Sequence, residues 1–252
     1  MRIIFVRHGE PDYENDCLTE EGRRQAAAAA ERLAGEGISA IYASPCGRAA
    51  ETASYTAARL ELPVTTLDFM HEIGWGGEGI PCDGHPWTLG DRMLAEGFDF
   101  QQGNWRAHPY FHGNAATAYY GNIATAFDAF LAGHGYRHEG RRFFCDGGTD
   151  ETVALFSHGG SGACVLAHIL NLPFPYVASV LPYDFTSIII LDFPANPGAY
   201  IFPRVELFND CAHIRRHAGA STEIRAVKEL EHHEIPGHPK DPRGKIHHPI
   251  RR

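Results

Sequence analysis

Short apolar segments rich in β-branched residues alternate along the chain with longer segments of helical character. The run from Arg2 to Val6 is typical of a buried strand, and the alanine-rich stretch at residues 25–30 favours helix. Strands that alternate with helices of this length form a mainly parallel sheet with helices on both faces. The sequence therefore predicts an α/β fold, a three-layer sandwich with a mostly parallel central sheet and an inserted lid-like region. We expect strands at residues 2–6, 38–43, 64–69, 152–156, 186–191 and 199–207, and helices at 19–36, 47–60, 116–131 and 160–170.

Two segments interrupt or follow this alternation. Residues 71–150 hold all three tryptophans and many glycines and histidines, and their one clear element is the helix predicted at 116–131. We interpret this segment as an inserted partial lid whose aromatic residues mostly form a small core. From residue 209 the chain turns polar and proline-rich, which is typical of an arm or a disordered tail. The predicted domain therefore spans residues 1–208, followed by a C-terminal arm or tail at 209–252.

Charge and cysteine content limit the partners of the chain. Residues 1–203 hold 12 basic and 24 acidic residues, and all 12 basic residues are arginine. Such an acidic body argues against nucleic acid or an anionic membrane as partner, since both attract a basic face. The apolar runs are far shorter than the ~18 residues of a membrane helix, and the first is too short for a signal peptide. The six cysteines lie far apart, which fits reduced thiols. We expect a cytoplasmic protein, and the sequence does not indicate its oligomeric state.

Cationic residues follow three of the predicted strands. Arg7 and His8 come after the first strand, Arg48 lies near the start of the helix after the second, and His158 follows the strand at 152–156. A glycine follows each of the two histidines, and it lets the backbone approach a ligand closely. In open α/β sheets, ligands collect outside the carboxyl ends of the strands. A single histidine at such a place is usually structural, but four such groups in one crevice repel one another unless an anion joins them. Guanidinium groups and helix N-termini suit phosphate, so the sequence predicts a phosphate site.

Four ordered motifs surround these residues. R-H-G-E stands at residues 7–10, L-T-x-x-G-x-x-Q-A at 18–26, S-x-x-x-R-A-x-x-T at 44–52, and S-H-G-G at 157–160. With these motifs the chain resembles the histidine phosphatase superfamily, also called phosphoglycerate mutase-like proteins. The resemblance covers residues 1–76 and 150–192 and leaves most of the insertion and the tail unmatched. It implies a phosphatase that hydrolyses phosphomonoesters of small metabolites.

The resemblance also implies a role for each matching residue. His8 would attack phosphorus and form a phosphohistidine, which divides one displacement into two easier ones. The phosphate oxygens would be held by four groups, those of Arg7, Arg48, His158 and Gly159. The resemblance implies no metal and no other cofactor, because the cationic side chains take over the role that magnesium has elsewhere.

The proton donor to the leaving group is expected after the third strand. The family commonly places an acid there in a segment like E-x-x-x-G-x-W-x-G, and residues 71–78 are compressed relative to that pattern. Glu72, with a pKa raised by partial burial, is the expected donor, and Glu78 is the second candidate. A merely solvated glutamate remains an alternative.

Other residues are weaker candidates. Asp12, Tyr13, Asn15 and Trp75 are expected to line the substrate pocket, although Asn15 fits a turn equally well. Seven histidines follow residue 208, and the pair His213 and His217 has i, i+4 spacing without the glutamate of a metalloprotease motif. We interpret these histidines as solvated and predict no metal site.

Two other functions remain open. A phosphoglycerate mutase uses the same centre but returns the phosphoryl group to bound substrate. Mutases of the family have a longer loop after R-H-G and a segment like N-E-R-H-Y-G near the acid; this chain lacks both, which favours hydrolysis. A non-catalytic phosphate-binding module is the other alternative, and the presence of all four cationic residues weighs against it. The partner implied in each case is a small phosphorylated molecule.

Overall fold

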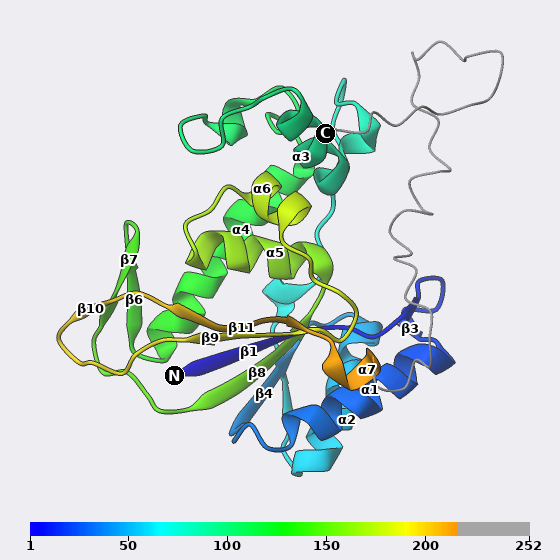
Figure 1. Cartoon of the computed structure of the whole chain (residues 1–252), viewed down its shortest axis with the longest axis vertical. Coiled ribbons are helices and arrows are strands. Elements are labelled where there is room, and N and C mark those ends of the chain that lie inside the picture. Colours follow the sequence, from blue (N-terminus) through cyan, green and yellow to red (C-terminus); the bar gives the residue numbers. More distant parts are fainter. Residues whose placement is uncertain (216–252) are drawn as a thin grey trace, which may run out of the picture. The chain divides into compact units, whose positions relative to one another are not determined.

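The middle layer of the structure is a six-stranded sheet (Figure 1). The structure is a computed structural model that describes residues 1–215. In spatial order the strands are β11 (Arg204–Asp210), β9 (Ile188–Asp192), β1 (Arg2–Arg7), β8 (Thr152–Ser157), β4 (Ala40–Ala43) and β5 (Val64–Thr66). β8 pairs in parallel with β1 and β4, and β4 with β5, whereas β9 runs antiparallel to both of its neighbours. The predicted mostly parallel α/β sheet is confirmed.

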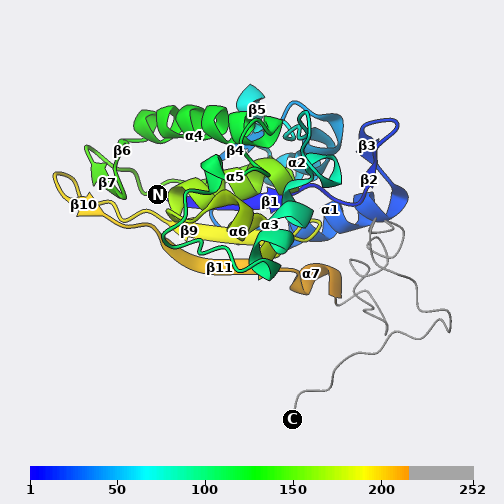
Figure 2. The same cartoon turned by 90° about the horizontal axis from the view of Figure 1, so that it is seen from above.

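Helices cover both faces of this sheet (Figures 1 and 2). Side chains alternate along a strand between the two faces, so Ile4 and Val6 of β1 join one core and Ile3 and Phe5 join the other. The first core packs against α1 (Glu20–Leu33) and α2 (Gly47–Leu60). The second packs against α4 (Ala115–Gly133), α5 (Gly159–Ile169) and α6 (Phe174–Val180). The three layers predicted from the sequence are therefore present.

The predicted insertion at residues 71–150 contains a helix of this second layer. α4 buries Phe127, whose ring centroid lies 6.1 Å from that of Phe5 in β1. Its buried residues recur at helical spacing, so the helix packs on the sheet beside α5. The preceding residues form α3 (Pro86–Ala95), which packs on α6, and three short 3₁₀ helices, Asp68–Met70, Cys82–Gly84 and Trp105–Ala107. Aromatic residues of the segment are core material as expected, since Trp105 is buried between Phe111 and Tyr120.

Several elements differ from the prediction. The strand expected at 199–207 is two strands, because Pro203 lacks the N–H that would continue the ladder. β10 (Tyr200–Ile201) joins a small sheet with β7 (Arg142–Cys145) and β6 (Tyr136–Glu139), whereas β11 joins the main sheet. The strand expected at 64–69 ends at Thr66. Elements that the sequence pattern did not reveal include α3, α6, the β6–β7 hairpin, and the hairpin of β2 (Pro11–Asp12) and β3 (Cys17–Leu18).

The C-terminal part of the described chain extends past residue 208. β11 continues to Asp210, and α7 (Ala212–Arg215) follows it. The arm or tail predicted at 209–252 lies outside the described residues from 216 onward. Among the helices of residues 1–215, none combines the length and the apolar character needed to cross a bilayer.

Candidate active site

His8 lies directly after β1, at the carboxyl edge of the sheet. Its side chain is 1% exposed, and its Nδ1 lies 2.7 Å from the carbonyl oxygen of Gly9. A carbonyl oxygen only accepts hydrogen bonds, so this contact places the ring hydrogen on Nδ1 of the neutral imidazole. Nε2 therefore keeps its lone pair and is free to act as a nucleophile.

His158 lies beside His8, as the sequence predicts. The parallel register pairs Arg7 with Ser157, so the residue after each strand reaches the same edge. The two imidazole centroids are 5.2 Å apart. Burial lowers the pKa of His8 to about 3, with the Arg7 guanidinium as the second cause. Burial and the neighbouring His8 lower the pKa of His158 to about 2, so both rings are neutral at physiological pH.

The two predicted arginines contribute to the same site. Arg7 donates from Nη1 to the carbonyl oxygen of Tyr183 at 2.7 Å, and its Cζ lies 4.3 Å from the ring centroid of Phe185. Arg48 is 9% exposed and stands in the first turn of α2. Both guanidiniums lower the pKa of His8 and of His158. Four groups from three strand ends thus meet at one edge of the sheet.

Glu72 lies against the first turn of α5. Its Oε1 accepts hydrogen bonds from the backbone N–H groups of Ile73 at 2.9 Å, Gly160 at 3.1 Å and Ser161 at 3.2 Å. A Cβ at residue 160 would stand 2.5 Å from this oxygen, so glycine is required where the helix approaches the carboxyl group. Burial raises the pKa of Glu72 despite these bonds and the nearby arginines. A carboxyl group of this kind suits general acid–base chemistry.

The remaining predicted site residues lie in different surroundings. Gly159 begins α5, where an added Cβ would stand 3.4 Å from Cζ of Arg7. Glu78 is exposed, and Trp75 is 42% exposed and makes edge contacts with His85 and Trp87. These contacts place Trp75 with other aromatic residues of the insertion.

The loop after the R-H-G-E motif contains the other three candidates. Asp12 accepts hydrogen bonds from the backbone N–H groups of Glu14 and Asn15 and from the Asn15 amide, so Asn15 is a turn residue. Tyr13 is 68% exposed, and its ring centroid lies 5.5 Å from Cζ of Arg48. Of these three residues, Tyr13 contacts a predicted phosphate ligand, Arg48.

Sequence reasoning missed two residues that position the site. Asp16 accepts from Arg48 at 2.5 Å and from the backbone N–H of Gly47 at 2.7 Å. An added Cβ at residue 47 would stand 2.1 Å from the Asp16 carbonyl oxygen, which explains the glycine. Oγ of Ser44 lies 2.7 Å from Nε2 of His158. Ser44 is part of a quoted motif and was thus recognisable, whereas no spacing pointed to Asp16.

Comparison with known proteins identifies the family. The model of the histidine phosphatase superfamily (branch 1) matches residues 3–200. The chain belongs to the histidine phosphatase superfamily. The four sequence motifs therefore reflect membership of this superfamily, and the observed fold is the fold that membership implies.

A hydrolase and a phosphatase of known structure share the fold of this histidine phosphatase superfamily member. A mycobacterial hydrolase is 25% identical, with a TM-score of 0.58 over 83% of this chain and 98% of that chain. A mycobacterial glucosyl-3-phosphoglycerate phosphatase is 24% identical, with a TM-score of 0.57 over 82% of this chain and 98% of that chain. Likeness at this level of identity establishes the fold.

A curated relative of this superfamily member is a mutase. The 2,3-bisphosphoglycerate-dependent phosphoglycerate mutase of Thermoplasma acidophilum is 40% identical over an alignment of 87 residues, and the match covers 30% of this chain. The match spans 44% of the length of that relative. The proteins similar to this chain thus include a phosphatase and a mutase.

Proposed function

We propose that the protein is a phosphatase that hydrolyses phosphomonoesters of small metabolites through a phosphohistidine at His8. The observation that carries the proposal is the contact between Nδ1 of His8 and the Gly9 carbonyl oxygen, which leaves Nε2 as the nucleophilic atom. Two guanidiniums and a second neutral imidazole beside that atom form a site for a dianionic phosphoryl group.

In the first step, Nε2 of His8 attacks phosphorus while the bond from phosphorus to the ester oxygen breaks. Arg7 and Arg48 hold the equatorial oxygens, where charge is spread in the transition state. Ser44 Oγ accepts from the N–H of Cys46, so its own hydrogen is available to Nε2 of His158. The ring hydrogen of His158 then resides on Nδ1, which donates to a phosphate oxygen.

Glu72 supplies the proton that the departing alkoxide needs. Its Oε1 accepts three backbone hydrogen bonds, so the proton resides on Oε2. In the second step the ionised carboxylate takes a proton from water, the resulting hydroxide attacks phosphorus, and the bond to Nε2 breaks. Inorganic phosphate leaves, and His8 and the protonated Glu72 are restored. No step in this scheme requires a metal ion.

The mutase alternative is favoured by one observation, the 40% identity to the Thermoplasma mutase over 87 residues. A mutase would use the same first step and return the phosphoryl group to bound substrate. The loop from Glu10 to Leu18 closes into the short β2–β3 hairpin, and the sequence lacks the segment like N-E-R-H-Y-G. Hydrolysis is therefore the proposal, and mutase activity is an outcome of the test.

The test is a panel of phosphomonoesters assayed with the full-length protein in the presence of EDTA. The wild type is expected to release phosphate and to trap a phosphoryl group that is stable to alkali and lost in acid. His8→Ala is expected to lose on the order of 10⁴-fold or more in kcat/KM and to trap none, because the nucleophile is gone. His134→Asn is the matched control, because this histidine lies in the connection between α4 and β6, outside the site.

Three results would contradict the proposal. Interconversion of 3- and 2-phosphoglycerate that is much faster than hydrolysis would identify a mutase. Binding of phosphate without turnover of any ester would identify a binding module. Turnover that stops in EDTA and returns with a divalent cation would contradict the metal-independent scheme.

A further inference from the structure

A second group of histidines lies at the other end of α5. His168 in the last turn of α5, His138 in β6 and Asp128 in α4 point three side-chain atoms at one another. The distances are 2.7 Å between Nε2 of His168 and Oδ1 of Asp128, and 3.0 Å between Nδ1 of His138 and the same oxygen. The two ring nitrogens are 3.1 Å apart. Among residues 1–215, this is the one group of at least three such side chains whose ligand atoms converge.

The three atoms have the separation that a tetrahedral metal ion requires. Zn²⁺ bonds of about 2.0–2.1 Å at the tetrahedral angle separate neighbouring ligand atoms by roughly 3.3 Å. The observed separations are 2.7–3.1 Å, so an ion fits after each atom moves by a few tenths of an ångström. Two imidazoles and one carboxylate are a ligand set that suits Zn²⁺ and related divalent ions.

Hydrogen bonds alone satisfy this triangle poorly. With both rings neutral and both hydrogens directed at Asp128, the two N–H groups of His138 and His168 face each other across 3.1 Å. Directing one N–H at the other ring removes one of the two bonds to the carboxylate. A cation at the centre takes one lone pair from each atom and satisfies all three contacts together.

The surroundings hold the three side chains in place. The side chain of His138 is 8% exposed, and its ring stacks on Phe143 at 4.3 Å with an interplanar angle of 12°. Nε2 of His138 is buried and has no hydrogen-bond partner in the part of the chain that the structure describes, so Nδ1 is the atom of this ring that meets other polar groups.

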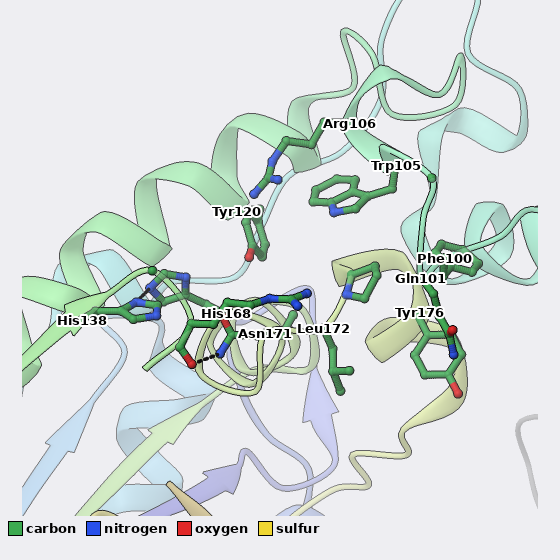
Figure 3. A pocket seen from close by; sticks show the side chains of 15 residues that line it. Phe100, Gln101, Trp105, Arg106, Tyr120, His138, His168, Asn171, Leu172 and Tyr176 are labelled. Carbon is green, nitrogen blue, oxygen red and sulfur yellow. Dashed lines mark hydrogen bonds between the residues drawn. The ribbon is translucent and has the colours of Figure 1, made fainter. Parts of the chain in front are cut away.

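A cavity of about 750 Å³ opens beside the two histidines (Figure 3). Figure 3 shows His138 and His168 next to each other at one end of it, with Tyr120 and Arg106 above. Arg106 and Arg141 line the same cavity. The guanidinium groups of this cavity suit a water molecule or a small anion as the fourth ligand of an ion held there.

We infer that Asp128, His138 and His168 form a binding site for a divalent transition-metal ion of the zinc class. The ion joins α5 to α4 and β6, and so stabilises the packing of these three elements. Ten residues of helix separate His158 from His168, which is about 15 Å at 1.5 Å per residue. At that distance the ion takes no direct part in chemistry at His8, and the site is independent of the phosphate site.

The test measures metal binding by the full-length protein without reference to activity. Metal-free wild type, His168→Asn and Asp128→Asn are titrated with Co²⁺, followed by visible absorption, and with Zn²⁺, followed by thermal unfolding. The wild type is expected to bind one ion with a tetrahedral Co²⁺ spectrum, and Zn²⁺ is expected to raise its Tm. Both variants are expected to lose the spectrum and the rise in Tm. Their affinity should fall by more than the ~10–100-fold that loss of an outer-shell partner costs.

Two controls separate this site from other histidines. The side chain of His134 is 15% exposed, as is that of His168, and it is paired with the Glu151 carboxylate. The His134→Asn variant should therefore retain the ion. The double change of His232 and His233 to Asn tests the histidine-rich C-terminal sequence and should also retain it. Circular dichroism checks that each variant is folded, and Asp128→Asn provides the test if His168→Asn is not. Equal binding by wild type and both variants, or absence of binding by the wild type, would overturn the inference.

Discussion

The two ends of α5 each present a pair of histidines, but the partners of the two pairs have opposite charge. At the N-terminal end, His158 lies beside His8 with Arg7 and Arg48 near both rings. At the other end, His168 lies beside His138 with a carboxylate between them. In the two proposed sites, the same side chain on the same helix therefore serves an anion at one end and a cation at the other. The anion end comprises Arg7, His8, Arg48 and His158, and the cation end comprises Asp128, His138 and His168.

This difference shows that the neighbours of an imidazole decide its chemistry. Guanidiniums and burial keep His8 and His158 neutral, and the N-terminus of α5 adds backbone N–H groups that favour negative charge. The carbonyl end of the helix favours positive charge, and there the Asp128 carboxyl group contacts both histidines.

Replacement of the proposed acid tests the anion end most strongly. Glu72→Gln should lower kcat/KM for alkyl phosphates by about 10²–10⁴-fold, because proton transfer to the leaving oxygen is lost. The loss should be much smaller for an aryl phosphate whose leaving group needs no proton. The raised pKa of Glu72 implies that the wild-type rate falls as the pH rises through it, since the acid loses its proton. That alkaline limb should disappear in the variant.

The exposed Glu78 provides the matched control for this measurement. Glu78→Gln changes a glutamate of the same segment and should retain nearly full activity. A loss confined to Glu78→Gln would move the proton donor to that residue, which is the second candidate from the sequence.

Much of the anion end could be predicted from the sequence because its residues follow strand ends. In a parallel sheet, the residues after neighbouring strands reach the same edge, and the observed register places Arg7 opposite Ser157. His8 and His158 are thus brought together by strand order alone. Asp16 escaped prediction because its contact with Arg48 depends on the shape of the loop after β1, which no periodicity encodes.

The cation end could not be predicted for a related reason. Its ligands come from α4, β6 and α5, and the sequence separations carry no local motif. The helix containing Asp128 was correctly expected, but the β6–β7 hairpin that carries His138 lies in a segment without clear alternation. Long-range packing therefore fixed the residues that the sequence pattern left unassigned.

Acid should destabilise the protein through the neutral histidines of the anion end. The unfolded chain protonates these rings below about pH 6.5, whereas the pKa is about 3 for His8 and about 2 for His158 in the folded protein. Acidification thus favours unfolding, by about 1.4 kcal/mol per pH unit for each ring between about pH 6 and pH 4.5. His8→Asn and His158→Asn should each reduce the slope of the unfolding free energy against pH by about 1.4 kcal/mol per pH unit, and the double variant by twice that amount. Urea unfolding at a series of pH values measures this slope. Identical slopes in all four proteins would contradict the pKa assignment.

Replacement of Asp16, which positions Arg48, should have a moderate effect on activity. Asp16→Asn keeps the size of the side chain but removes the charge that holds the guanidinium, and kcat/KM should fall about tenfold. Glu14→Gln is the matched control, since Glu14 is an exposed acidic residue of the same loop and should retain activity. Equal losses in both variants would indicate a general effect on the loop.

The smallest effect on activity should come from the cation end, and it makes the two ends separable. His168→Asn removes a proposed metal ligand about 15 Å along α5 from His158, so its kcat/KM should stay within about twofold of the wild type at temperatures well below the Tm. Its Tm in the presence of Zn²⁺ should nevertheless be lower, because binding to the folded state alone stabilises a protein. Steady-state kinetics and thermal unfolding of the same samples measure both. A large loss of kcat/KM with an unchanged Tm would mean that the two ends are coupled through α5 and that the partners of one histidine pair influence the chemistry of the other.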